Sequence, residues 1–214
     1  MSTVAIAGAH GKIAMLLGGM LAERGETVRG LIRNPDQEAD LRAAGIEPVL
    51  CDLEGDGDVA AAVRGADAVV FAAGAGAGSG EARKSTMDLG GAVKLIEAAK
   101  VDGIARYLMV SSMGADDPPA EGGGVFGAYL RAKAAADEAL RGSGLDYTIV
   151  RPGSLTDDPG TGLVSIAEHL GRGHVPRADV ARVLAACLDM SGTIGRSFDL
   201  LAGGTPIVDA LARL

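Results

Sequence analysis

The chain has 214 residues, enough for one domain with a full core. Hydrophobic residues make up 48% of it, but aromatic residues only 3% and there is no Trp, so the core must be built from Ala, Val, Leu and Ile. The net charge of −8 argues against nucleic acid or an anionic membrane surface as a partner. We expect a small-molecule substrate, and a monomer or a small homo-oligomer.

The two cysteines and the N-terminal segment allow a prediction of the cellular compartment. Cys51 and Cys187 stand among apolar residues, outside any CxxC or histidine spacing, so we expect free buried thiols and no metal site. The chain enters a strand-like segment directly, without a basic leader, and no apolar stretch approaches the length that spans a membrane. We therefore expect a cytoplasmic protein that does not contact a membrane.

Apolar runs alternate with helical patterns along the whole chain. The apolar runs predict strands at residues 3–8, 27–33, 46–53, 67–74, 105–112, 146–153 and 196–204. The amphipathic runs predict helices at residues 12–25, 36–45, 57–66, 86–103, 125–144 and 177–190, and a glycine-rich loop covers residues 75–84.

This alternation predicts a single α/β domain over residues 1–214. Successive strands joined by helices must run parallel with right-handed crossovers, which gives a Rossmann-like, doubly wound parallel sheet flanked by helices. Residues 153–178 do not fit the alternation, and we expect them to form a small loop or helix on the substrate side.

The segment VAIAGAHGKIAMLL places two glycines between the first strand and the first helix. Gly8 and Gly11 allow a sharp turn and a close approach of the backbone to a pyrophosphate, and Ala14 is small enough for close contact between helix and strand. A tight structural turn is the alternative, but the position after the first strand of an alternating chain favours a phosphate site. Its backbone donors would come from His10, Gly11, Lys12 and Ile13.

The end of the second strand bears on the choice of nucleotide. NAD sites usually carry Asp or Glu there, whereas this strand ends at Arg33. A guanidinium can hold the 2′-phosphate of NADP by charge-assisted hydrogen bonds, so the sequence favours NADP. A solvated arginine at the sheet edge is the alternative, and Arg29 is a weaker candidate because it lies elsewhere along the strand.

Taken in order, the motifs GAHGKIA, RNP, CDL, FAAG, VSS, YLRAK and TIVRPG resemble the short-chain dehydrogenase/reductase superfamily. The chain is most similar to its atypical single-domain NAD(P)-binding branch, with the NmrA-like, the flavin/biliverdin-reductase-like and the proteins described as NAD-dependent epimerases. The resemblance covers nearly the whole chain. It implies contacts to adenine from Asp52 and Leu53, to ribose and pyrophosphate from Ala72, Ala73 and Gly74, and to nicotinamide from Pro152, Gly153 and Ser154.

The resemblance also implies catalytic residues. Tyr129 and Lys133 lie at i and i+4 on one helix face, where the family has a proton-donating Tyr and a Lys that lowers its pKa and holds the nicotinamide ribose. Ser112 matches the family's Ser or Thr that bonds the substrate oxygen. Asp88 stands where these enzymes usually have Asn, and a carboxylate cannot replace both hydrogen-bonding roles of an amide.

Four other polar residues are interpreted as non-catalytic. Arg151 is expected to be a structural ion-pair partner, and the three histidines to be turn or loop residues: His10, His169 and His174.

The predicted function is an NADP(H)-dependent oxidoreductase that transfers hydride to or from a small carbonyl, quinone-like or conjugated substrate. A non-catalytic NADP(H)-binding redox sensor of the NmrA type is the first alternative, and the orientation of Tyr129 separates the two. A sugar-nucleotide epimerase or dehydratase is less favoured, because such enzymes need a larger C-terminal substrate domain.

Overall fold

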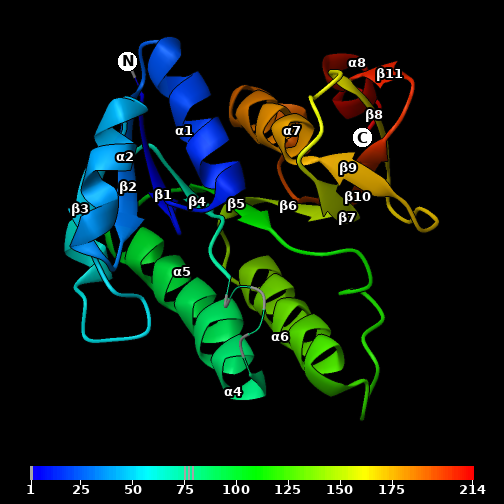
Figure 1. Ribbon diagram of the computed structural model, residues 1–214, viewed down its shortest axis with the longest axis horizontal. Helices are drawn as coiled ribbons and strands as arrows, with labels where there is room; N and C mark the ends of the chain where they lie inside the picture. Colours follow the sequence, from blue (N-terminus) through cyan, green and yellow to red (C-terminus); the bar gives the residue numbers. More distant parts are fainter. Residues whose placement is uncertain (1, 75, 77, 79) are drawn as a thin grey trace.

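A computed structural model describes residues 2–74, 76, 78 and 80–214. Among these residues, nine strands form one sheet in the order β11-β8-β10-β6-β5-β4-β1-β2-β3 (Figure 1). The strands are β1 (Thr3–Ala7), β2 (Thr27–Ile32), β3 (Glu47–Leu50), β4 (Ala68–Phe71), β5 (Arg106–Val110), β6 (Asp146–Pro152), β8 (Leu163–Ala167), β10 (Arg196–Ala202) and β11 (Thr205–Pro206). Two short strands, β7 (Ser154–Thr156) and β9 (His174–Pro176), pair with each other.

Helices cover both faces of the sheet (Figure 1). One face carries α1 (Lys12–Glu23), α2 (Glu38–Ala43) and α7 (Arg177–Asp189), and the other α3 (Val59–Val63), α5 (Ala92–Val101) and α6 (Gly124–Arg141). Two short elements, η1 (Pro35–Gln37) and η3 (Ser191–Thr193), and the final helix α8 (Ile207–Leu211) complete the chain. Each layer packs on the sheet mainly through Ala, Val, Leu and Ile side chains, and the aromatic residues Phe71, Tyr107 and Phe198 are buried in the same core.

The strand order confirms the predicted Rossmann-like fold. β1 lies between β2 and β4 and pairs parallel with both, so the chain changes direction across the sheet at this point. The turns after β1 and β4 are therefore neighbours at the carboxyl edge of the sheet, where doubly wound folds bind ligands. The predicted strands and helices up to residue 153 are present, with boundaries shifted by a few residues.

The prediction of a loop or helix for residues 153–178 was wrong. Instead of a loop or helix, this segment contributes β7, β8 and β9, and α7 begins at Arg177. β8 pairs antiparallel with β10, so the sheet is not wholly parallel. The β-branched residues Val164 and Ile166 of the segment LVSIA favour a strand. This strand pairs with the edge of β10 that β6 leaves open. A short segment by itself does not indicate which strand of a sheet has an open edge.

The segment after β4 also differs from the prediction. The predicted loop at residues 75–84 was too long, because α4 (Glu81–Arg83) begins inside it and continues into the π-helical segment η2 (Lys84–Gly91). Residues 75, 77 and 79 of that loop lie outside the described residues. π-Helical hydrogen bonds join residues five apart instead of four, so the side chains of η2 face other directions than they would in an α-helix. A hydrophobic pattern cannot reveal that difference.

No helix among the described residues has the length and apolar character needed to cross a bilayer. The same part of the chain contains no cluster of three or more His, Cys, Asp or Glu side chains placed to hold a metal ion.

Candidate functional site

A large cavity opens at the carboxyl ends of β4, β5 and β6. We call it the wide cavity; its volume is about 1320 Å³. It brings together all four predicted catalytic residues, Asp88, Ser112, Tyr129 and Lys133. Its walls also hold the residues predicted near ribose, pyrophosphate and nicotinamide: Ile13, Ala72, Ala73, Gly74, Pro152, Gly153 and Ser154.

A second, narrow cavity of about 320 Å³ adjoins the first. The two share Ala72, Ala73 and Gly74, which follow β4. The narrow cavity is lined by the remaining predicted residues other than Lys12, namely Gly8, His10, Gly11, Arg33, Asp52 and Leu53. The pair of cavities therefore forms one elongated site across the point where the strand order reverses.

The turn between β1 and α1 is built for close approach. Gly8 has a φ of +76°, and a Cβ there would lie 2.5 Å from the Cα of Ala73. Gly11 caps α1 without a side-chain hydrogen bond, and the first turn of α1 holds no acidic residue. The first N–H groups of this 12-residue helix are thus left for an outside acceptor, and the helix dipole favours an anion there. The turn fits a pyrophosphate.

Two residues of this turn direct their side chains elsewhere. The His10 imidazole pairs with Asp40 on α2, with 2.8 Å between Nε2 and Oδ2. Lys12 lines neither cavity, since its ammonium pairs with Asp157, which also binds Arg177. The predicted contribution of Lys12 is therefore restricted to its backbone N–H.

Arg33 lies in the narrow cavity as part of a charged group that the sequence did not reveal. Its Nη1 is 3.3 Å from Glu54 Oε2, and Arg83 Nη2 is 3.0 Å from the same oxygen. Burial disfavours the charge on Glu54, but hydrogen bonds from Thr86 and Arg83 and the nearby guanidinium charges outweigh it and lower the pKa of this carboxyl. Two guanidinium groups thus converge on one anionic position at the mouth of the narrow cavity.

Tyr129 faces the wide cavity from α6. It is half-buried, and no described residue hydrogen-bonds its hydroxyl. Two ammonium groups lie near its ring, with Lys84 Nζ 5.3 Å and Lys133 Nζ 5.9 Å from the ring centre. The ring also packs against Phe126 of the same helix, with 6.0 Å between the ring centres.

Lys133 is the more deeply held of the two lysines. Its side chain is 3% exposed and its Nζ lies 3.3 Å from Oδ1 of the fully buried Asp88. It also donates to the Val110 carbonyl at 3.0 Å. The Asp88 carboxylate, at the usual place of an amide, therefore neutralises the lysine that the resemblance assigns to the ribose and to tuning the tyrosine. Lys133 still lines the wide cavity.

Ser112 lies at the end of β5 and lines the wide cavity, with its hydroxyl 3.3 Å from the Met113 carbonyl. The preceding Ser111 is buried, and its N–H donates to the Val150 carbonyl. Both serines line the wide cavity, but Ser111 is 3% exposed whereas Ser112 is partly exposed, so Ser112 is the more accessible of the two.

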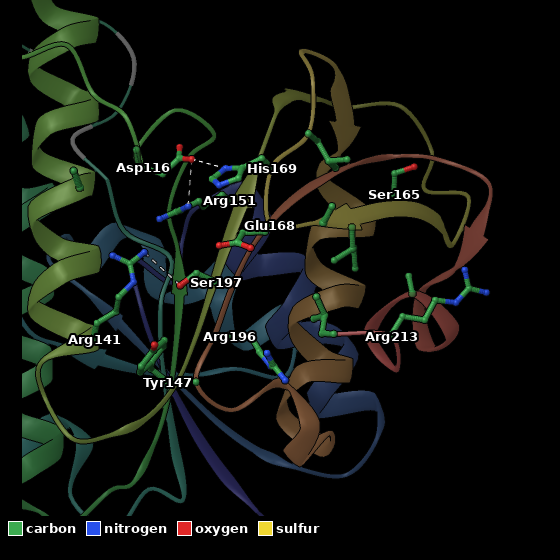
Figure 2. Close-up of a pocket in the computed structure, with 18 of the residues that line it drawn as sticks. Asp116, Arg141, Tyr147, Arg151, Ser165, Glu168, His169, Arg196, Ser197 and Arg213 are labelled. Atoms are coloured by element: carbon green, nitrogen blue, oxygen red, sulfur yellow. Dashed lines mark hydrogen bonds and ion pairs between the residues drawn. The ribbon is translucent and has the colours of Figure 1, made fainter.

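A third cavity of about 1080 Å³, the edge cavity, lies beside β8 and β10 and contains no predicted catalytic or nucleotide-binding residue (Figure 2). Arg151 borders it and binds the buried Asp137, with 3.1 Å between Nε and Oδ2, so its predicted structural role is confirmed. Burial raises the pKa of the Asp137 carboxyl, against the opposing effect of Arg151. His169 binds Asp116 at 2.7 Å in the same region and does not line the wide cavity.

Both cysteines are free and buried, as predicted. Burial raises the pKa of Cys187 to about 12, and burial together with the charges of Asp52 and Asp58 raises the pKa of Cys51. Neither thiol is therefore activated as a nucleophile.

Sequence reasoning missed Arg83 and Lys84. Both were assigned to the glycine-rich loop, yet Arg83 lines the narrow cavity and Lys84 the wide one. The available signal was a pair of basic residues at the end of a glycine-rich stretch that follows a buried strand, since such stretches lie at the ligand edge of the sheet.

The fold and the site together define a dinucleotide-binding protein of the Rossmann type with an oxidoreductase-like arrangement. The sequence profile of the NAD(P)H-binding family matches residues 8–191. The chain belongs to this NAD(P)H-binding family, and the predicted resemblance is confirmed.

Individual relatives agree with this assignment. The chain is 43% identical to the uncharacterized sugar epimerase YhfK of Bacillus subtilis, over 99% of both chains. A Bacillus halodurans structure provisionally described as an NAD-dependent epimerase/dehydratase has a TM-score of 0.94 and 40% identity, with full coverage of both chains. The anaerobillin reductase ChuY of Escherichia coli O157:H7 has a TM-score of 0.80 and 27% identity, over 94% of this chain and 97% of that one.

Proposed function

We propose that this protein is an NADP(H)-dependent oxidoreductase that passes hydride between the nicotinamide and a small carbonyl, quinone-like or conjugated substrate. The observation that carries the proposal is the position of Tyr129, which faces the same cavity as Ser112 and the turn at Gly153. In the family, that turn borders the nicotinamide. A proton donor, an orienting hydroxyl and the nucleotide wall thus surround one space.

Each group of residues in the site has its own role in the proposed reaction. The turn from Gly8 to Ile13 would hold the pyrophosphate, and Pro152–Ser154 would border the nicotinamide, whose reduced form would supply the hydride. Ser112 donates a hydrogen bond to the substrate oxygen and fixes its position. Tyr129 gives its proton to that oxygen as negative charge develops on it. In the oxidative direction Tyr129 takes the proton back.

The side chains at the rim of the wide cavity favour binding of an apolar substrate. Val125, Phe126 and Leu155 line it, and their exposures are 45%, 64% and 36%. Large apolar side chains exposed beside a cavity mark a surface that a ligand covers. A sugar would need polar partners there, so the rim does not support the epimerase naming of some relatives, and the position of Tyr129 does not support a non-catalytic sensor.

The direct test of catalysis is Tyr129→Phe. We expect the NADPH-dependent reduction rate on a panel of quinones and aromatic aldehydes to fall about 100- to 10,000-fold, the usual contribution of a general acid. Affinity for NADPH should stay within about twofold, because the hydroxyl gives no binding to the nucleotide. Tyr147→Phe, which removes a hydroxyl beside the edge cavity, is the matched control and should leave both quantities unchanged. A Tyr129→Phe variant with full activity would disprove the assigned role.

The nucleotide preference is tested at Arg33. A guanidinium bound to a phosphate contributes about 1.5–3 kcal/mol, so Arg33→Ala should weaken NADPH about 10- to 100-fold and leave NADH nearly unchanged. Glu54→Gln should shift the preference further toward NADPH, since it removes the carboxylate that competes for both guanidinium groups.

Arg29→Ala is the control, because this arginine of the same strand donates to the Arg64 carbonyl at 2.7 Å, away from the narrow cavity. The measurement is titration of each variant with NADPH and NADH. Equal affinity of the native protein for the two nucleotides would overturn the NADP assignment, and binding of neither would overturn the proposed function.

A further inference from the structure

One buried cation of the wide cavity has no part in the mechanism above. Lys84, the first residue of η2, is only 9% exposed and lines the wide cavity. Its Nζ donates to the Gly76 carbonyl at 3.0 Å and lies over the Tyr129 ring. The ammonium is therefore held beside the proton donor proposed above.

The two lysines around Tyr129 differ in their counter-charge. Lys133 is paired with Asp88 at 3.3 Å, whereas no carboxylate of the described residues pairs with Lys84. An ammonium has three donors, and the Gly76 carbonyl takes one of them. A buried charge with a single neutral acceptor is costly, and an anionic partner removes that cost. Lys84 thus places a positive charge in the wall of the wide cavity that no carboxylate of the described residues balances.

The other cations that line the wide cavity help to identify the kind of anion that Lys84 can bind. Arg177 is engaged by Asp157 at 2.7 Å. Arg172 is exposed and lines the wide cavity, so its guanidinium can contact the same anion from the solvent side. The remaining walls at the rim are apolar, through Val125, Phe126 and Leu155. A phosphate dianion needs more donors than this wall offers, whereas a monoanion on an apolar body matches one buried ammonium and an apolar rim.

We propose that Lys84 binds an acidic group of the substrate, so that the substrate class is an apolar organic acid, with a carboxylate on Lys84 and its reducible group at Tyr129. This inference rests on the proposed function only in taking the wide cavity as the substrate site. Lys84 is a specificity-determining residue: it selects acids over neutral molecules of the same shape.

Two fluorescent dyes with one skeleton test the charge selection. 1-Anilinonaphthalene-8-sulfonate is an apolar monoanion, and N-phenyl-1-naphthylamine is the same framework without the sulfonate. Each is titrated into the protein saturated with NADP⁺, which does not interfere with the dye emission. We expect Lys84→Met to weaken the sulfonate dye at least tenfold and to leave the neutral dye within twofold. Lys84→Arg, which keeps the charge, should bind both dyes like the native protein.

The controls separate the possible failures. Lys100→Met removes an exposed lysine of α5 and should change neither dye. Lys84→Gln gives the same comparison should the methionine variant unfold. Equal loss of both dyes, an unchanged affinity for the sulfonate dye, or no binding of that dye to the native protein would each overturn the proposal. So would an equally large loss of NADP⁺ affinity, because Lys84 would then serve the nucleotide.

The dye titration is repeated without nucleotide. If no nucleotide binds to any variant, the proposed function fails, while the dye comparison still reports on Lys84. If the nucleotide binds and reduction is observed, 4-formylbenzoate and its methyl ester extend the test to turnover. Lys84→Met should then raise KM at least tenfold for the acid and leave KM for the ester unchanged.

Discussion

Lys133→Met is expected to lower the free energy of unfolding by about 3–5 kcal/mol, the usual cost of removing one partner of a buried ion pair. Asp88 is fully buried and Lys133 is 3% exposed, so the methionine would leave the Asp88 charge without its compensating cation. Asp88 belongs to η2 and Lys133 to α6, so the ion pair also joins these two elements. Urea unfolding with an unchanged m-value measures the effect.

The double variant Asp88→Asn/Lys133→Met separates charge from packing. It removes both charges, so most of the lost stability should return. Lys100→Met is the surface control, and its cost should stay below about 0.5 kcal/mol. If Lys133→Met and the double variant are equally unstable, the loss comes from packing of the side chain and the ion pair is not what stabilises the site.

Gly8→Ala is expected to lower the free energy of unfolding by about 3 kcal/mol and to weaken NADPH at least about tenfold. The left-handed φ of +76° costs a side-chain-bearing residue about 1–2 kcal/mol. The added Cβ also meets the backbone of Ala73 at 2.5 Å, and overpacking of this kind costs about 1–3 kcal/mol more. The turn must move away from β4 to relieve the contact, which widens the cradle for the pyrophosphate.

Gly65→Ala is the matched control for this change. Gly65 has a φ of +71°, but no atom lies within 4 Å of its added Cβ. It should therefore show only the conformational cost of about 1–2 kcal/mol and should bind NADPH normally. Equal losses of stability in the two variants would mean that the close approach of Gly8 to Ala73 contributes nothing.

The two lysines beside Tyr129 suggest a division of roles. In the predicted arrangement one lysine both tunes the tyrosine and holds the ribose. Here Lys133 shares its charge with Asp88, while Lys84 approaches the same ring from η2. The dye titrations and the Tyr129→Phe kinetics together decide whether substrate charge and proton transfer depend on different residues, as we propose.

The sequence determined the sheet order around β1, the phosphate turn and most of the wide cavity. Strands and helices that alternate without interruption admit few topologies, and residues that follow parallel strands must meet at one edge of the sheet. Gly8, Ala73, Ser112 and Gly153, far apart in the chain, each follow a predicted strand, and the family resemblance assigned the last three of them to the same site.

Only the tertiary structure decided the features that depend on contacts between distant segments. The antiparallel addition of β8 depends on the free edge of β10. The π-helical turn of η2 determines that Asp88 meets Lys133 and that Lys84 turns into the wide cavity. The convergence of Arg33 and Arg83 on Glu54 joins segments on either side of β4. Local sequence patterns record the period and polarity of one segment, whereas burial, counter-charge and close approach arise from which segments pack together.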